Sequence, residues 1–270
     1  MPPHLSEKVD FGAWDYSTPP SMSCSMFWLL PPYWCGGFVP KRFKKCGRCM
    51  MLVRLDGHSV EARRVFCIGQ NYAAHITEMK SETPDSPVIF SKPSTSLVLP
   101  GTKIPFPGHG NELHYEAEVV VMVGTEGRPE HRDDARRFVG GVSLGLDLTM
   151  RDLQKELRAR GLPWETAKAF DYSAPVGEFT SDLGESGLAN ISFTLRVNGE
   201  VRQKGNTGRM IFDIPTILLA IGRVWTLLPG DIVFTGTPEG VGALSRGDRA
   251  VVESPVIGKF EWEIAVGCEA

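Results

Sequence analysis

Residues 113–124, LHYEAEVVVMVG, join a strongly apolar run to acidic side chains at its start. Val119–Val123 has the composition of a buried β-strand, so the chain must build a sheet and a core around it. Side chains alternate between the two faces of a strand, and residues two apart point the same way. His114, Glu116 and Glu118 are therefore predicted to share one face, with two carboxylates aimed at the edge of the core.

The remainder of the chain predicts short strands joined by turns. Gly (29) and Pro (20) are abundant and separate short β-branched runs, including 64–68 and 231–235. Asn198-Gly199 is the strongest short hairpin signal and predicts that 193–197 pairs with 200–203. Because strands outnumber helices and no regular βαβ alternation is present, the predicted fold class is α+β, mostly β, with a mixed but mainly antiparallel sheet.

A few helices are also expected. Residues 71–80 predict a short helix or an ordered loop, and 129–138 predict a surface helix. Thr149 is expected to cap a helix that runs through Gly161. Residues 213–224 predict an apolar helix, with a proline suited to its first turn.

Residues 141–148 predict a strand with an unusual alternation. One face is apolar and consists of Val142, Leu144, Leu146 and Leu148. The other face is small except at its last residue and consists of Gly141, Ser143, Gly145 and Asp147. This pattern leaves room beside the Asp147 carboxylate.

Composition excludes several classes of protein. The chain of 270 residues is 42% hydrophobic and carries a net charge of -3, so it has no basic surface typical of nucleic-acid binding. No apolar run approaches the length of about 18 residues that a membrane span needs. Beyond residue 50 the only cysteines are Cys67 and Cys268, which predicts a reducing, cytoplasmic compartment without a disulfide framework.

The first fifty residues do not match the rest of the chain. They show no helical or strand period, and acidic residues near the start disfavour a signal or transit peptide. Their four cysteines are Cys24, Cys35, Cys46 and Cys49. A zinc site is one interpretation; the preferred ones are a disordered tail or an over-called start before Met50 or Met51. The chain is thus expected to divide into a tail, 1–50, and one main domain, 51–270.

The acidic side chains suggest a site for a hard cation. Glu116, Glu118 and Asp147 offer the oxygen ligands that Mg²⁺ prefers, with Mn²⁺ as the alternative ion. Without a cation, clustered carboxylates repel one another and take up protons. The simpler interpretation is a solvated strand end, which spacing alone does not exclude.

Two further groups have both a chemical and a simple structural interpretation. His75 and Glu78 are three apart, so on a helical turn the carboxylate would raise the basicity of the imidazole, as a general base requires. They could equally form a surface pair. Lys168 lies between apolar residues and could stabilise an oxyanion, or it could be a surface lysine with a buried stem.

Six motifs in order resemble the fumarylacetoacetate hydrolase family, in its short single-domain branch of acylpyruvate hydrolases and oxaloacetate decarboxylases. The resemblance covers roughly residues 64–266. The motifs are GQNYAAH (69–75), SKPST (91–95), HYEAE (114–118), LDLTMRD (146–152), WETAKAF (164–170) and TGTPEGVG (235–242).

The resemblance implies a mixed β-roll, a homodimer, one divalent metal per subunit and a small keto-acid substrate. Position by position, it implies that the metal ligands are Glu116, Glu118 and Asp147. It implies that His75 and Glu78 form the water-activating dyad, on a lid segment, and that Lys168 stabilises the oxyanion. The implied substrate contacts are Lys92, Arg151, Gln154 and Thr237. Gln70 departs from the family, where relatives often carry Arg or Leu.

The implied reaction cleaves a C–C bond in an acylpyruvate. A hydroxide formed with the help of His75 attacks the distal carbonyl, and pyruvate enolate leaves, so the products are pyruvate and a carboxylic acid. Oxaloacetate decarboxylation and oxaloacetate keto–enol tautomerisation are alternatives that share the enolate. A non-enzymatic metal-binding protein on the same fold is a third interpretation.

Overall fold

The structure is a computed structural model that describes residues 51–79, 81–184 and 187–267. The expectations for residues 1–50, including the zinc site and the tail, and the observation on Cys268 fall outside these residues. In the described residues, no helix has the length and hydropathy needed to cross a membrane.

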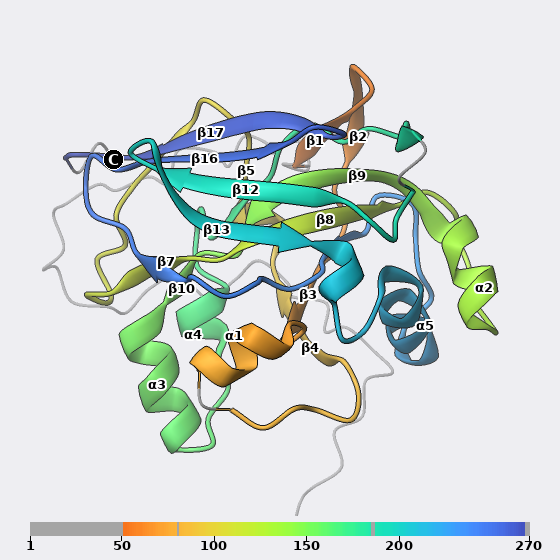
Figure 1. Ribbon diagram of the computed structural model, residues 1–270, viewed down its shortest axis with the longest axis horizontal. Coiled ribbons are helices and arrows are strands. Elements are labelled where there is room, and N and C mark those ends of the chain that lie inside the picture. Colours follow the sequence, from red (N-terminus) through yellow and green to blue (C-terminus); the bar gives the residue numbers. More distant parts are fainter. Residues whose placement is uncertain (1–50, 80, 185–186, 268–270) are drawn as a thin grey trace, which may run out of the picture. The chain divides into compact units, whose positions relative to one another are not determined.

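Two five-stranded sheets form the body of the molecule (Figure 1). The first has the order β4 (Val88–Lys92), β3 (Val65–Gly69), β14 (Ile232–Phe234), β8 (Ala117–Val123) and β9 (Val139–Leu146). The second has the order β13 (Glu200–Asn206), β12 (Ser192–Val197), β16 (Arg249–Ser254), β17 (Gly258–Ile264) and β6 (Lys103–Ile104). Most pairs are antiparallel, whereas β14 with β3 and β17 with β6 are parallel, which confirms the mixed, mostly β fold class.

Strand β8 is buried on both faces, which explains its continuous apolar sequence. Val119, Val121 and Val123 pack into the larger core, which also contains residues of the second sheet. Val120 and Met122 point the other way, into a smaller core with β3 and β14. Strand β8 therefore separates two apolar layers.

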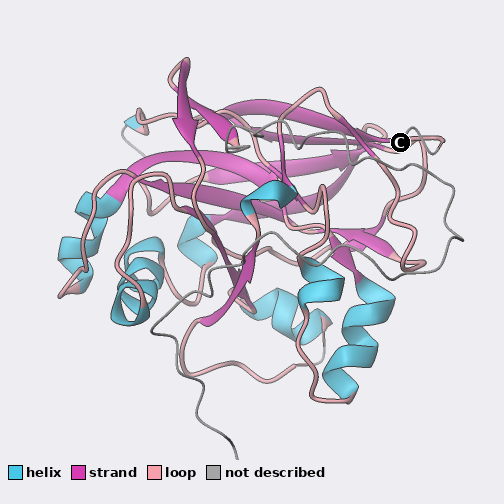
Figure 2. Ribbon diagram, turned by 180° about the vertical axis from the view of Figure 1, so that it is seen from behind, coloured by secondary structure: helices cyan, strands magenta, loops and turns pink. Residues whose placement is uncertain are grey.

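Smaller elements complete the fold. They are the hairpin β1 (Leu52–Leu55) with β2 (His58–Glu61), the sheet β10 (Thr149–Met150), β7 (Leu113–Tyr115) and β15 (Gly242–Ala243), and the pair β11 (Ala174–Pro175) with β5 (Leu97–Val98). The helices are α1 (Ala73–Glu78), α2 (Arg132–Ala135), α3 (Arg151–Ala159), α4 (Glu165–Lys168) and α5 (Ile214–Val224). Figure 2 shows these helices gathered on one side, with most of the strands on the other.

Several expectations from the sequence are confirmed. The hairpin turns at Asn198 and Gly199, which both have positive φ, as a type I′ turn requires. Helix α5 begins after Asp213, whose carboxylate accepts a hydrogen bond from the Thr216 N–H. The helix predicted over 129–138 is shorter, because α2 gives way to a 3₁₀ turn at Arg136–Phe138.

Two expectations need correction. Thr149 does not cap a helix: it pairs with His114 in β10, its hydroxyl donates to the Asp147 carbonyl, and α3 begins only at Arg151. Residues 113–123 are not a single strand either. They divide at Glu116 into β7 and β8, which belong to different sheets.

Candidate metal centre and active site

Three buried carboxylates converge where β8 and β9 meet the short sheet. Glu116 lies between β7 and β8, Glu118 is the second residue of β8, and Asp147 directly follows β9. Pairing of Glu118 with Gly145, and a hydrogen bond from the Asp147 N–H to the Glu116 carbonyl, fix their register. Each offers a carboxylate oxygen within 4.8 Å of the other two. The structure thus brings together all three predicted ligands.

Two cationic side chains contact Glu116. The Lys168 ammonium lies 2.7 Å from Glu116 Oε2 and 2.6 Å from Asp147 Oδ2, and the Arg151 guanidinium donates to Glu116 Oε1. Burial would raise the pKa of Glu116, but Lys168 and Arg151 outweigh it and hold that pKa well below its usual range. Burial would likewise lower the pKa of Lys168, yet Asp147 and Glu116 raise it. Both partners are therefore charged at neutral pH.

Glu118 has the opposite electrostatic surroundings. Its Oε2 accepts a hydrogen bond of 2.7 Å from the Gly236 N–H. Burial, followed by repulsion from Asp147 and Glu116, raises its pKa well above the usual range. A divalent cation among the three groups would relieve this repulsion and keep Glu118 ionised.

Asp147 supplies a second sign that the cluster fits a cation. Its Oδ1 is fully buried and accepts no hydrogen bond, although the Lys92 ammonium lies 2.9 Å away. A buried carboxylate oxygen without a hydrogen bond is uncommon in a folded protein. An all-oxygen donor set that is buried and incompletely satisfied fits a hard ion such as Mg²⁺ or Mn²⁺.

The predicted dyad lies on α1, beside the carboxylates. Nδ1 of His75 lies 3.3 Å from Glu78 Oε2, and His75 is almost completely buried. Both carboxylate oxygens of Glu78 also lie 3.2 Å from the Gly240 N–H, so the helix is tied to the glycine-rich loop 236–242. In this arrangement Glu78 can orient the imidazole and hold α1 over the site.

One cavity connects the dyad with the acidic cluster. It has a volume of about 40 Å³, room for only about three waters, and His75 and Ile76 of α1 form part of its lining. Its polar lining includes Gln70, His75, Glu116, Glu118, Arg151, Gln154, Lys168 and Thr237. The backbone of Gln70 has a φ of 59°, a conformation uncommon for a residue other than glycine.

Lys92, by contrast, is not part of this lining. Its ammonium lies behind Asp147 and donates to the carbonyls of Leu148 and Ser173, at 3.2 and 3.0 Å, and to that of Lys168. In this structure it orders the backbone that carries Asp147 and Lys168. Lys92 is therefore one shell behind the lining of this cavity, and its contact with a substrate stays a prediction.

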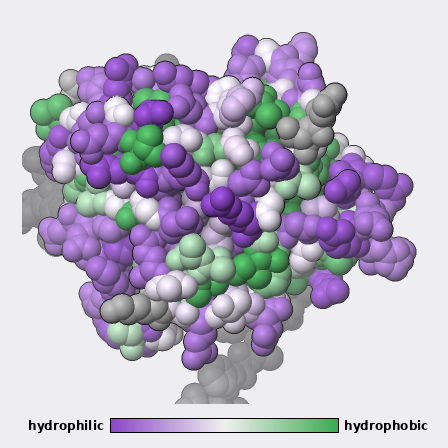
Figure 3. Space-filling view, viewed as in Figure 1, coloured by the Kyte–Doolittle hydropathy of each residue, from purple (hydrophilic) through white to green (hydrophobic). Residues whose placement is uncertain are grey.

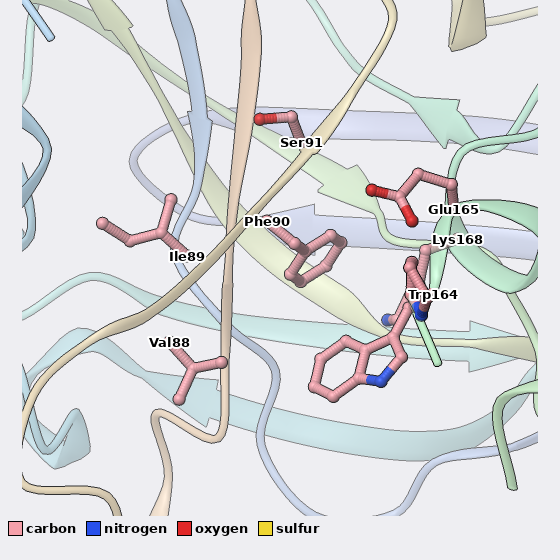
Figure 4. A pocket seen from close by; sticks show the side chains of 8 residues that line it. Val88, Ile89, Phe90, Ser91, Trp164, Glu165 and Lys168 are labelled. Atoms are coloured by element: carbon pink, nitrogen blue, oxygen red, sulfur yellow. The ribbon is translucent and has the colours of Figure 1, made fainter. Parts of the chain in front are cut away.

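A second, more apolar pocket adjoins the first. Its volume is about 260 Å³, and it lies between β4 and the start of α4. Figure 4 shows Phe90 and Trp164 side by side, with Lys168 next to Trp164. The two rings meet edge to face, with centroids 6.1 Å apart, and all three residues line both pockets. On the face shown in Figure 3, hydrophobic side chains also gather around α1.

Two buried amides that sequence reasoning missed position the site. Asn71 donates to the Thr235 and Phe212 carbonyls at 2.8 and 2.9 Å, and it accepts from the Phe212 N–H at 2.8 Å. Gln203 donates to Thr237 Oγ1 and accepts from the Ala117 N–H, both at 2.9 Å. Neither role had a local signal, because each amide contacts residues far away in the sequence.

Comparisons with known proteins bear on the family. Residues 64–265 match the family described as fumarylacetoacetate (FAA) hydrolase C-terminal. The mitochondrial oxaloacetate tautomerase FAHD1 of Bos taurus is 41% identical over 187 residues, which cover 69% of this chain and 85% of the bovine protein. The oxaloacetate tautomerase YcgM of Escherichia coli strain K12 is 40% identical over 195 residues, 70% of this chain and 87% of that protein.

A solved structure is similar in both fold and sequence. The crystal structure of fumarylpyruvate hydrolase from Pseudomonas aeruginosa, in complex with Mn²⁺ and pyruvate, superposes with a TM-score of 0.76 at 35% identity. The match covers 81% of this chain and 97% of that one. The sequence match and the shared fold agree with the motifs identified in the sequence, and the chain belongs to the fumarylacetoacetate hydrolase family.

Proposed function

We propose that this family enzyme is a divalent-metal-dependent hydrolase that cleaves a C–C bond in acylpyruvates, such as fumarylpyruvate or acetylpyruvate. The observation that carries the proposal is the convergence of Glu116, Glu118 and Asp147, together with a cavity that His75, the imidazole of the dyad, lines with Glu116 and Glu118. The fumarylpyruvate hydrolase of similar fold, which contains Mn²⁺ and pyruvate, supports both the ion class and the product.

The three carboxylates would hold Mg²⁺ or Mn²⁺. When bound, the ion supplies Lewis-acid polarisation of the keto acid, worth several kcal/mol of transition-state stabilisation. Gln154 and Thr237 line the cavity and offer polar groups to the keto acid, and Arg151 contributes positive charge beside Glu116. These side chains orient the substrate between the cluster and the dyad.

His75 acts as the general base. Glu78 accepts a hydrogen bond from the Nδ1–H group of His75, which leaves Nε2 free to take a proton from water. The resulting hydroxide attacks the distal carbonyl carbon, and the C–C bond breaks with its electron pair retained by the pyruvate enolate. Lys168 stabilises the developing negative charge, and protonation of the enolate gives pyruvate.

The net charge of the cluster fits an anionic substrate. Three carboxylates are balanced by Lys92, Arg151 and Lys168, so a bound divalent ion leaves two positive charges in excess. A keto acid that ionises to a carboxylate and an enolate carries two negative charges. Binding of such a substrate would therefore leave the buried site neutral.

Oxaloacetate tautomerisation is the second candidate, because the bovine and Escherichia coli relatives carry that name. Decarboxylation of oxaloacetate would use the same enolate without attack by water. The homodimer and the cytoplasmic location also remain predictions; the bovine relative is named as mitochondrial.

The test is a substrate panel of acetylpyruvate, fumarylpyruvate and oxaloacetate, assayed with and without Mg²⁺. We expect His75→Ala to lower acylpyruvate hydrolysis by about 10²- to 10⁴-fold and to leave oxaloacetate decarboxylation partly intact. His58→Ala, at an exposed histidine of β2, is the control. Equal loss of both reactions would contradict water activation by His75, and no turnover of any substrate would favour a non-enzymatic metal-binding protein.

A further inference from the structure

Helix α3 presents three polar side chains to the active-site cavity. Arg151, Gln154 and Arg158 are spaced by three and four residues, so they share one face of the helix, and all three line the cavity. Arg151 and Gln154 are buried and bonded to each other, and Arg151 also contacts Glu116. Arg158 is the exposed member of the row, at the far end from the carboxylates.

Arg158 differs from the other cations of α3. Lys155 is paired with Glu112 at 3.3 Å and Arg160 with Glu156 at 2.9 Å. Within the described part of the chain, no carboxylate lies within 4.0 Å of the Arg158 guanidinium. Its side chain instead donates one hydrogen bond of 3.2 Å to the hydroxyl of Ser81. A guanidinium at the rim of a catalytic cavity thus keeps most of its donors free for an anion.

The position of Arg158 defines the length of ligand that it could reach. Seven residues of helix place it about 10 Å along the axis from Arg151, which contacts the metal cluster. Ser81 follows α1, the helix that carries the dyad, so this hydrogen bond places Arg158 at the cavity rim near the end of α1. A keto acid anchored at the cluster would direct its far end toward this rim.

We propose that Arg158 binds a second carboxylate at the far end of the substrate, so that the site is specific for dicarboxylic 2-keto acids. This inference rests on the proposed function and narrows its substrate class. The planar fork of a guanidinium matches a carboxylate in bidentate geometry. Fumarylpyruvate has six C–C bonds between its carboxylates and oxaloacetate has three, so fumarylpyruvate spans the distance from the metal cluster to Arg158 better.

The apolar pocket of Figure 4 offers the competing route. If the far end of the substrate turned past Phe90 and Trp164, an uncharged acyl chain would be preferred and Arg158 would not matter. The charge balance favours the route toward Arg158 over the route into the apolar pocket. The filled cluster already attracts anions, and a third positive charge at the rim adds to that attraction.

Kinetics of Arg158→Gln test the inference. With the Mg²⁺-loaded enzyme, we expect kcat/KM for fumarylpyruvate to fall about 10- to 100-fold, mainly through KM, because a charge-assisted hydrogen bond is lost. The loss should be smaller for oxaloacetate and less than about two-fold for acetylpyruvate, which lacks the second carboxylate. Arg158→Lys should restore part of the loss, and the matched control Arg160→Gln should leave all three substrates unchanged.

A binding measurement separates this inference from the hydrolase assignment. The probes are 2-oxoadipate and 2-oxohexanoate, two keto acids of equal chain length that differ in the far carboxylate. We expect Arg158→Gln to weaken only 2-oxoadipate, by about 10-fold or more. If the wild-type protein shows this selectivity but hydrolyses no acylpyruvate, the function fails and the Arg158 site stands. Equal binding of both probes to the wild-type protein, or equal loss of both in the variant, would overturn the Arg158 site.

Discussion

The Lys168 ammonium lies 2.6 Å from Asp147 Oδ2, so a buried cation is already in contact with the group expected to bind the metal. Lys168 and a divalent ion would thus share the same carboxylates, and their charges repel. This contact orders the carboxylates and also limits how tightly they can hold an ion. The lysine therefore has opposite effects on metal affinity and on turnover.

Lys168→Met should separate these effects. At a fixed pH we expect Mg²⁺ to bind at least about 10-fold more tightly, because a unit positive charge a few Å away is removed. Turnover should fall by about 10²-fold or more, since the oxyanion loses its cation. Titration calorimetry and steady-state kinetics measure both, with Lys155→Met on exposed α3 as the control. Unchanged metal affinity would rule out this competition.

Metal affinity should also depend on pH through Glu118. Burial and the neighbouring Asp147 and Glu116 raise the pKa of Glu118 well above its usual range, so a proton must leave before an ion binds. We expect the affinity for Mg²⁺ to fall as pH falls through this raised pKa, by up to about 10-fold per pH unit for one proton. Calorimetry between pH 6 and 8.5 follows the change.

Glu118 affects the folding stability of the metal-free protein with the opposite dependence on pH. A carboxyl whose pKa is raised by folding stabilises the metal-free protein below the pKa of the unfolded chain, and that stabilisation is lost as pH rises through the folded pKa. Glu118→Gln should therefore raise the melting temperature of the metal-free protein at pH 8 while abolishing tight Mg²⁺ binding. Glu126→Gln, at an exposed site, should change neither. A lower melting temperature in Glu118→Gln would show that Glu118 is ionised and satisfied without an ion.

Gly236 links the glycine-rich loop to the metal cluster. Its φ is +100°, its N–H donates to Glu118, and an added Cβ would come within 2.7 Å of Asn71 Cβ. We expect Gly236→Ala to displace the loop and to weaken Mg²⁺ binding about 10-fold, the value of a lost charge-assisted hydrogen bond. Gly101→Ala is a matched control, because Gly101 has a φ of +81° and nothing within 4 Å. Equal metal affinity in the two variants would contradict this role.

Asp213 should matter for stability and not for the reaction. It caps α5 and binds the Arg132 guanidinium. Burial would raise its pKa, but the hydrogen bonds from Arg132 and Thr216 lower it. Asp213→Ala should cost about 1 kcal/mol in urea unfolding at pH 7. A carboxyl with a lowered pKa loses its stabilising effect as pH falls through that pKa, so the difference should narrow toward pH 3.5. Asp133→Ala, at a side chain that is 97% exposed, is the control.

The sequence predicted those elements whose cause is local. The Asn198-Gly199 turn, the apolar run of β8 and the helix after Asp213 each carry their own signal, and each is confirmed. Thr149 shows the limit of this reasoning. A threonine before a helical pattern resembles a cap, but pairing with His114, which is distant in the sequence, places it in a strand instead.

The candidate site likewise contains features that the local sequence predicts and features that it does not. Alternation predicted that Glu116 and Glu118 share a face and that Asp147 has space beside it, whereas the family resemblance predicted that they form one ligand set. The pairing of Glu118 with Gly145 brings the carboxylates together. The sequence could not show that Lys92 lies behind Asp147, nor that Asn71 and Gln203 hold the loops around the cluster. These contacts join residues far apart in the chain, so only the fold brings them together.

The central claim is that Glu116, Glu118 and Asp147 together hold one divalent ion, and anomalous diffraction from crystals grown with Mn²⁺ tests it most directly. We predict a single strong peak in each subunit, within about 2.0 to 2.2 Å of an oxygen from each of the three carboxylates. A peak elsewhere, or the Lys168 ammonium remaining between Glu116 and Asp147 with no peak at saturating Mn²⁺, would contradict it.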